Sequence, residues 1–292
     1  MPAIEPPNVN PLFKLADKRK ADNRLLVVFS DSKYMGVLLN WLIAIHRLGF
    51  RNYLIISLDE TIHAFLVERG FPSVLRKLEG PLHNLWRLRL VVLRELCSYG
   101  VHVIHSDIDA VWLRDPIPEF FSRDADHLVV SQGTVWPDDV LRRQGFVLCC
   151  GLFYLRSSSE TMTLLDHMLL DIVTTNDDQI SLNRLISASV TWDRQPKNPY
   201  QFMFRGHVVA CSEEAIRGRC RKTGLSVTLL PHHLFQRIHM PDRPAFVKHL
   251  FSEKTDKDKF ESFRQSGCLF LHENWKNIEF DAETIQRIAL HP

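Results

Sequence analysis

The first third of the chain alternates between two patterns of apolar and polar positions. Residues 25–29 and 53–58 are short, continuous apolar runs of the kind buried in a parallel sheet. Residues 36–48 instead carry apolar positions at helical spacing and end at Gly49, a residue typical of helix ends. A second helix is predicted from Asp59 to about residue 70. The pattern therefore predicts strand, helix, strand and helix in succession.

The alternation continues with a helix over residues 83–98 and a third strand over 101–105. Strands that alternate with helices predict a parallel α/β sheet of the Rossmann type. The second half is less regular and predicts a mixed sheet, with strands near 127–131, 147–155, 207–211, 226–230 and 268–272 and helices near 158–173 and 177–188. We expect one domain over residues 24–292, with a soft internal boundary near 125, after an N-terminal lead-in over residues 1–23.

Composition narrows the class of protein. The 292 residues are 45% hydrophobic and 24% charged, which is typical of a globular protein with a large core. The 36 basic and 34 acidic residues leave a net charge of +2 without a long basic block, so nucleic acid is not an expected partner. The six cysteines form no Cys-x-x-Cys pair, which favours reduced thiols.

Membrane and targeting signals are not evident in the sequence. No apolar run reaches 18 residues, and the first residues lack the pattern of a signal peptide. We therefore expect no membrane segment and a cytoplasmic location. The alternative is the Golgi lumen, for a chain from which a membrane anchor has been removed.

Two carboxylates follow the third predicted strand directly. Open parallel sheets bind ligands beyond the carboxyl ends of their strands, and Asp107 and Asp109 lie at that position. Two carboxylates at this spacing supply hard oxygen ligands for magnesium or manganese, and such an ion can bridge a diphosphate. The structural alternative is that acidic residues simply end a strand and begin a turn.

The residues around this pair favour the metal-binding interpretation. An apolar strand precedes the pair, and the whole segment Asp107-Ile-Asp-Ala-Val-Trp-Leu-Arg-Asp-Pro116 resembles the metal-binding motif of nucleotide-diphospho-sugar transferases with the GT-A fold. It is similar to glycosyltransferase family seventy-seven, a family of xylosyl-, arabinosyl- and galactosyltransferases. The resemblance runs through residues 24–276 and is strongest over 83–118.

The resemblance implies roles for residues before and beyond the motif. The helix before the motif carries a basic residue that faces the diphosphate, and the spacing to Gly100 selects Arg89 from Arg87, Arg89 and Arg94. Cys150 and Gly151 lie in a segment that resembles the strand beneath the donor sugar, where glycine permits close backbone approach.

Two further segments resemble conserved parts of such enzymes. Asp178 and Gln179 resemble the Asp-Gln motif beside the sugar and are the predicted catalytic residues. His272 resembles the C-terminal histidine that completes the metal site, and Lys276 corresponds to a lysine for the phosphates. Ser30, where the first strand ends, is also a predicted donor-binding residue. Each of these side chains also has a structural interpretation, such as helix capping or packing.

The resemblance implies an enzyme that moves galactose, xylose or arabinose from a UDP-sugar to an acceptor hydroxyl, with Mn²⁺ or Mg²⁺ as cofactor and with retention. The expected acceptor is a glycan or a glycosylated or hydroxylated protein. A haloacid-dehalogenase-like phosphohydrolase with Asp107 as nucleophile is one alternative, because Asp107-Ile-Asp-Ala-Val fits its motif too. A GT-A-like scaffold that binds a sugar nucleotide without catalysis is the other.

Overall fold

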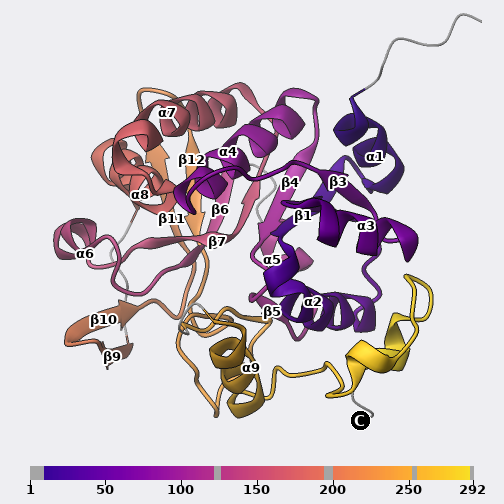
Figure 1. Cartoon of the computed structure of the whole chain (residues 1–292). Coiled ribbons are helices and arrows are strands. Elements are labelled where there is room, and N and C mark those ends of the chain that lie inside the picture. Colours follow the sequence, from indigo (N-terminus) through magenta and orange to yellow (C-terminus); the bar gives the residue numbers. More distant parts are fainter. Residues whose placement is uncertain (1–9, 122–125, 194–199, 252–254, 290–292) are drawn as a thin grey trace, which may run out of the picture.

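The fold is built on one nine-stranded sheet (Figure 1). The computed structural model describes residues 10–121, 126–193, 200–251 and 255–289. The strand order is β3-β2-β1-β4-β7-β6-β12-β11-β8. The strands are β1 Arg24–Ser30, β2 Tyr53–Ser57, β3 Ser73–Leu75, β4 His102–Ser106, β6 Leu128–Gln132, β7 Leu148–Leu155, β8 Val190–Trp192, β11 Ile216–Cys220 and β12 Ser226–Leu229.

The first half of the sheet is parallel and the second half is mixed, as the sequence predicts. β1 pairs in parallel with both β2 and β4, and β2 pairs in parallel with β3. β7 is antiparallel to both of its neighbours, β4 and β6, and β11 is antiparallel to β12 and β8. The expected α/β class with a mainly parallel first half is therefore confirmed, and a single sheet joins strands from both halves of the chain.

Helices cover both faces of this sheet, because alternate residues of the buried strands point to opposite sides. One core contains Leu25 and Val27 of β1 with residues of α1, α4, α7 and α8. The other contains Leu26 and Val28 with residues of α2 and α3. The helices are α1 Pro11–Arg19, α2 Met35–Arg47, α3 Glu60–Glu68, α4 His83–Ser98, α5 Ile117–Phe121, α6 Asp138–Gln144, α7 Ser159–Thr175, α8 Asp178–Ser189 and α9 Asp256–Gln265, and three short 3-10 helices are η1 Ser32–Tyr34, η2 Trp275–Asn277 and η3 Ile285–Ile288.

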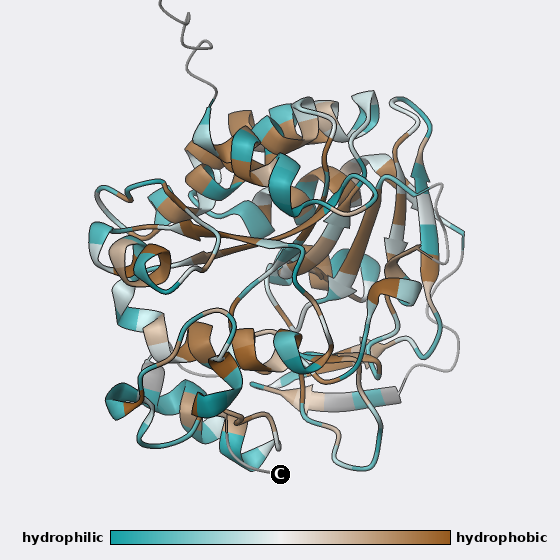
Figure 2. Ribbon diagram, turned by 90° about the vertical axis from the view of Figure 1, so that its right-hand side faces the viewer, coloured by the Kyte–Doolittle hydropathy of each residue, from teal (hydrophilic) through white to brown (hydrophobic). Residues whose placement is uncertain are grey.

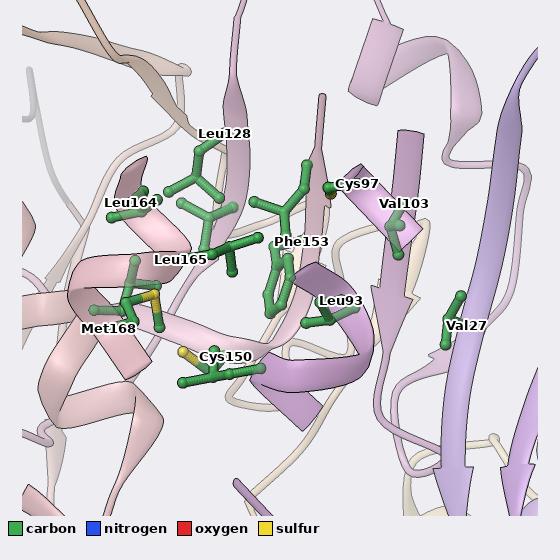
Figure 3. Close-up of a cluster of buried hydrophobic side chains, with 14 of the residues drawn as sticks. Val27, Leu93, Cys97, Val103, Leu128, Cys150, Phe153, Leu164, Leu165 and Met168 are labelled. Atoms are coloured by element: carbon green, nitrogen blue, oxygen red, sulfur yellow. The ribbon is translucent and has the colours of Figure 1, made fainter. Parts of the chain in front are cut away.

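The distribution of hydrophobic residues follows these layers. Figure 2 shows hydrophobic residues along the strands at the centre, with hydrophilic residues concentrated on the outer helices and loops. Figure 3 shows part of the first core, where Phe153 and Cys150 of β7 lie near Met168 of α7 and Leu93 of α4. All six cysteines are free and buried, as expected for reduced thiols. No helix of the described residues is long and apolar enough to cross a membrane.

Two small β units complete the structure. A three-stranded sheet of order β13-β14-β5 consists of β13 Phe235–Gln236, β14 Val247–Lys248 and β5 Val111–Trp112. A separate hairpin consists of β9 Tyr200–Phe204 and β10 His207–Cys211. The three-stranded sheet joins residues directly after the aspartate pair to a segment more than 130 residues later.

The structure changes two of the sequence-based assignments. The predicted lead-in over 1–23 contains α1, whose Leu12 and Ala16 are fully buried in the first core. Residues 268–272 are not a strand apart from one isolated bridge at Leu271. The physical reason is that Asn40 of α2 supplies this segment's backbone partners, since its Oδ1 accepts from Phe270 N (2.7 Å) and Leu271 N (3.1 Å). The predicted boundary near 125 lies outside the described residues.

If α1 is an integral part of the core, Leu12→Ala should lower the free energy of unfolding by about 2–5 kcal/mol, the usual cost of this truncation at a buried site. Urea unfolding measures this difference. Lys14→Ala is the control, because Lys14 is exposed on the same helix. Equal stability of the two variants would mean that α1 is dispensable.

Candidate active site

The aspartate pair lies in the turn that follows β4, at the carboxyl end of the parallel strands. Asp107 N donates to Gly151 O on the neighbouring strand β7 (2.7 Å), and Ala110 N donates back to Asp107 O (3.0 Å). Trp112 is buried beneath the turn, where its Nε1 donates to Ser106 Oγ (3.3 Å). The turn therefore has a defined backbone conformation that presents both carboxylates at this edge of the sheet.

His249 completes a three-residue cluster with these aspartates. Its Nε2 lies 3.1 Å from Asp109 Oδ1 and 3.6 Å from Asp107 Oδ2. One ligand atom from each of the three residues lies within 4.8 Å of the others. The antiparallel register pairs Val247 with Trp112 and Lys248 with Val111, so the residue after β14 arrives beside the aspartate turn. We call Asp107, Asp109 and His249 the Asp-Asp-His cluster.

Asp107 is ionised through contacts on one of its two oxygens. Arg89 Nη1 donates to Asp107 Oδ1 (3.0 Å), and His105 Nε2 lies 3.2 Å from the same oxygen. Burial alone would raise the pKa of Asp107, but the hydrogen bond with His105 and the charge of Arg89 lower it to about 2. Because Oδ1 is occupied by these contacts, Oδ2 is the oxygen that faces His249.

Asp109 is ionised through its contacts with two cationic groups. Lys259 of α9 donates through Nζ to Asp109 Oδ2, while His249 faces Oδ1. Burial opposes ionisation, but the charges of His249 and Lys259 hold the pKa of Asp109 well below its usual range. Burial likewise opposes the charge on His249, and Asp109 raises the pKa of His249 to about 9. The charged imidazole of His249 and the ammonium group of Lys259 therefore compensate the charge of Asp109.

Arg89 and Asp178 form a buried ion pair behind Asp107. The Arg89 guanidinium donates from Nε (2.7 Å) and Nη2 to Asp178 Oδ2, and both side chains are 5% exposed. Burial raises the pKa of Asp178 to about 6, against the charge of Arg89. Arg89 is thus not on a solvated helix face. Asp178 lies on the opposite side of Arg89 from Asp107, and its place beside a donor sugar stays a prediction.

Gln179 lies next to Cys150 and Gly151, and the place of all three at a donor sugar stays a prediction. Gln179 Oε1 accepts from Cys150 N (3.3 Å), and its Nε2 donates to Trp136 O (2.7 Å). The Cys150 side chain points into the first core beside Met168 (Figure 3). Only the backbone of Cys150 therefore faces Gln179.

Gly151 is required by the close approach of the Asp-Asp-His cluster. A Cβ atom there would lie 2.0 Å from His249 Cε1 and 2.5 Å from Asp107 Oδ2. Any side chain at this position would overlap two members of the cluster. The prediction of a close approach at Gly151 agrees with this geometry, and its place beneath a donor sugar stays a prediction.

The structure does not bring His272 or Lys276 to the aspartates. His272 Nδ1 accepts from Asn274 N (3.0 Å), and Lys276 is exposed on η2 with Nζ 5.7 Å from the Trp275 ring centroid. His249 lies with the aspartates in place of His272, and Lys259 contacts Asp109. The choice of His272 and of Lys276 rested on the order of residues within 269–276. The pairing of β14 with β5 instead brings His249, from an earlier segment, to the aspartates. A short apolar run, Ala245-Phe-Val247, ends two positions before His249 and was a weak local signal.

Ser30 lies at the same edge of the sheet, two strands from β7. It is 2% exposed, and its Oγ donates to Asp31 O (3.2 Å). The loop after β1 is joined to the start of α3, since Ser32 N donates to Asp59 Oδ2 (2.7 Å). A direct contact from the buried Ser30 side chain to a donor would require this loop to move.

The donor set of the Asp-Asp-His cluster fits a divalent cation. Two carboxylate oxygens and one imidazole nitrogen suit manganese, and the carboxylates also suit magnesium. Lys259 and the protonated His249 supply the positive charge at this position in the described structure. A divalent ion would take over that role after His249 Nε2 loses its proton.

Fold and site together define an α/β protein with two aspartates and a histidine at the carboxyl edge of its sheet, the edge at which open α/β sheets bind ligands. The profile of the nucleotide-diphospho-sugar transferase family matches residues 48–279. The chain belongs to this family. The resemblance to GT-A transferases that the sequence showed is thereby confirmed.

Curated relatives include plant arabinosyltransferases. The chain is 27% identical over 188 residues to arabinosyltransferase RRA2 of Arabidopsis thaliana, which covers 55% of this chain and 44% of that protein. Against arabinosyltransferase XEG113 of the same plant the identity is 25% over 168 residues, covering 52% of this chain and 26% of the relative. The chain thus spans less than half the length of these relatives.

Solved structures with a similar arrangement include two glycosyltransferases. The apo form of glycosyltransferase GlyE from Streptococcus pneumoniae TIGR4 gives a TM-score of 0.49 at 12% identity, covering 90% of this chain and 62% of that one. Galactosyltransferase LgtC in complex with donor and acceptor sugar analogs gives 0.47 at 13% identity, covering 86% and 99%. Both scores lie below 0.5, so the family assignment rests on the profile and the curated relatives.

Gly151→Ala should open the Asp-Asp-His cluster, because the added methyl group overlaps both His249 and Asp107. We expect Mn²⁺ affinity, measured by isothermal titration calorimetry, to fall at least tenfold. Overpacking should also lower the free energy of unfolding by about 1–3 kcal/mol. Gly218→Ala is the matched control, since its Cβ would lie 2.5 Å from Val190 Cγ1 in another part of the sheet. If both variants lose the same Mn²⁺ affinity, the loss does not come from overlap with the Asp-Asp-His cluster.

The raised pKa of His249 predicts a pH-dependent contribution to stability in the presence of a chelator. The folded pKa of about 9 exceeds the ordinary value of 6.5. The contribution is therefore complete below pH 6.5 and lost as pH rises to about 9. Relative to His249→Gln, the wild type should be more stable by on the order of 3 kcal/mol at pH 6 and by far less at pH 10. Urea unfolding at both pH values measures this, and a difference that does not change with pH would reject it.

Proposed function

We propose that this protein is a metal-dependent glycosyltransferase that moves a sugar from a UDP-sugar to an acceptor hydroxyl. The observation that carries the proposal is the Asp-Asp-His cluster at the carboxyl end of β4, in a chain that belongs to the nucleotide-diphospho-sugar transferase family. Mn²⁺ is the first choice of ion and Mg²⁺ the second, as the resemblance implies, and the two carboxylates suit both ions.

Three atoms would hold the ion, namely Asp107 Oδ2, Asp109 Oδ1 and His249 Nε2. A bound divalent ion supplies positive charge that stabilises the diphosphate as it leaves. Lys259 lies at the cluster through its contact with Asp109 and becomes available to phosphate oxygens once an ion compensates that carboxylate. It therefore replaces Lys276 as the lysine that we propose for the diphosphate.

The donor sugar is proposed to lie between Gly151 and Gln179. Gln179 is partly exposed next to Cys150 N. Gly151 lies beside the cluster, where His249 and Asp107 fill the space of its absent Cβ atom. Asp178 contributes through Arg89, since their ion pair fixes the guanidinium that contacts Asp107. We propose transfer with retention, as the resemblance implies, and without a covalent nucleophile, because the Asp178 carboxylate is buried against Arg89.

Arabinose is the first donor sugar to test, because the curated relatives are named arabinosyltransferases. Galactose and xylose follow from the resemblance. The proposed acceptor is a glycan or a glycosylated or hydroxylated protein. The cytoplasm and the Golgi lumen both stay predictions for the location.

The phosphohydrolase alternative assigns Asp107 the role of nucleophile. Asp107 Oδ1 is occupied by Arg89 and His105, and two strand–helix units, β1 with α2 and β2 with α3, precede the motif. The family match also favours the transferase. The intact Asp-Asp-His cluster supports catalysis over a scaffold that only binds a sugar nucleotide.

Asp107→Asn and Asp109→Asn should each weaken Mn²⁺ and UDP binding together, because both carboxylates serve the ion. Contacts to a charged group are roughly twice as strong as neutral hydrogen bonds, so we expect losses of at least tenfold in calorimetry. Metal-dependent hydrolysis of UDP-arabinose, UDP-galactose or UDP-xylose without an acceptor should fall in parallel. Wild-type protein should show no UDP-induced rise in melting temperature when a chelator is present.

Asp166→Asn is the control for these variants, since Asp166 pairs with Arg94 on the outer surface of α4 and α7. Its Mn²⁺ and UDP binding should equal those of the wild type. Unchanged Mn²⁺ binding in both active-site variants would contradict the proposal. Release of phosphate from p-nitrophenyl phosphate, with a phosphoryl group trapped on Asp107, would establish the hydrolase instead.

A further inference from the structure

We propose that Cys149 is a positioning residue for the Asp-Asp-His cluster. Its sulfur accepts a hydrogen bond from His249 Nδ1–H and so orients the ring with Nε2 toward both aspartates. The inference rests on the proposed function, because the orientation matters only if His249 binds an ion.

The contact is built into strand β7. Cys149 and Cys150 are adjacent, so their side chains point to opposite faces of the strand. Cys150 faces the first core (Figure 3), and Cys149 faces His249, with Sγ 3.6 Å from Nδ1. This separation suits sulfur, which has a larger radius than oxygen. Cys149 Sγ also accepts from Gly151 N (3.4 Å), which fixes the thiol beside the glycine that touches His249.

The chemistry of imidazole makes this contact specific. Only a ring protonated at Nδ1 leaves a lone pair at Nε2 for a metal ion. Histidine ligands usually donate their second ring N–H to an acceptor, and this bond fixes both the tautomer and the ring orientation. At His249 the sulfur of Cys149 takes the place that a carboxylate or a backbone carbonyl has in most such sites.

The backbone of His249 has its own restraints, which do not orient the ring. His249 N donates to Gln236 O (2.8 Å), and Arg237 Nη1 donates to His249 O (2.6 Å). These bonds place the Cα atom and leave rotation about the side-chain bonds free. The contacts of the ring nitrogens determine that rotation, with Cys149 on one side and the aspartates on the other.

The test is a series of variants assayed for Mn²⁺ affinity by isothermal titration calorimetry. Cys149→Ala should weaken binding by about 10–100-fold, the usual effect of removing such a partner. Cys149→Ser should recover part of this loss, because a hydroxyl oxygen also accepts from Nδ1–H but lies farther from the ring than sulfur does. Cys97→Ala is the matched control, because Cys97 is equally buried at 2% exposure and lies in the core on α4. It should bind Mn²⁺ as the wild type does.

A double-mutant cycle with His249→Ala separates positioning from packing. If Cys149 acts through the ring, Cys149→Ala should cause no further loss of affinity once His249 is alanine. Additive losses would overturn the inference, and so would wild-type affinity in Cys149→Ala. If Cys149→Ala does not melt cooperatively, the same double-mutant cycle is measured with Cys149→Ser in its place. Absence of Mn²⁺ binding in the wild type is a different result, because it rejects the metal-dependent function itself.

Discussion

The central physical constraint in this protein is the placement of two carboxylates at the edge of a buried sheet. Asp107 and Asp109 lie two residues apart, and like charges at such distances strongly oppose joint ionisation unless cations compensate them. Arg89, Lys259 and His249 provide that compensation. Each comes from a different part of the chain, so only the folded chain brings these cations to the two aspartates that it buries.

The order and pairing of the strands determine where the aspartates, Gly151 and His249 lie. β4 ends at the aspartates, and its antiparallel neighbour β7 contributes Gly151, whose carbonyl accepts from Asp107 N. The short pairing of β5 with β14 then brings His249 to the other side. A glycine is needed where these segments meet, because two side chains of the cluster occupy the space of its absent Cβ atom.

Buried charge extends behind the cluster through Arg89 to Asp178. Removing one partner of a buried ion pair leaves an uncompensated charge, which costs more than the pair contributes. Asp178 therefore has a structural role in holding Arg89, whatever further contact it makes during catalysis. The Asp-Gln segment begins helix α8 because the Asp177 side chain accepts a hydrogen bond from Ile180 N. The next residue, Asp178, is buried against Arg89.

The sequence by itself determined the elements whose signals are local. The strands β1, β2 and β4 and the helices α2 and α4 follow from continuous or periodic apolar runs, and the aspartate pair follows from its place after β4. Gly151 and Arg89 were selected by the resemblance, and the structure places both beside Asp107.

Only the tertiary structure decided which histidine and which lysine reach the aspartates. Asp109 and Lys259 are 150 positions apart, and the pairing that brings this region together uses strands of two residues each. Strands this short carry no periodicity, so several C-terminal histidines were equivalent in sequence. The register of β5 with β14 places His249, and not His272, beside the aspartates. That register depends on backbone pairing and burial across the folded chain, which no local sequence pattern records.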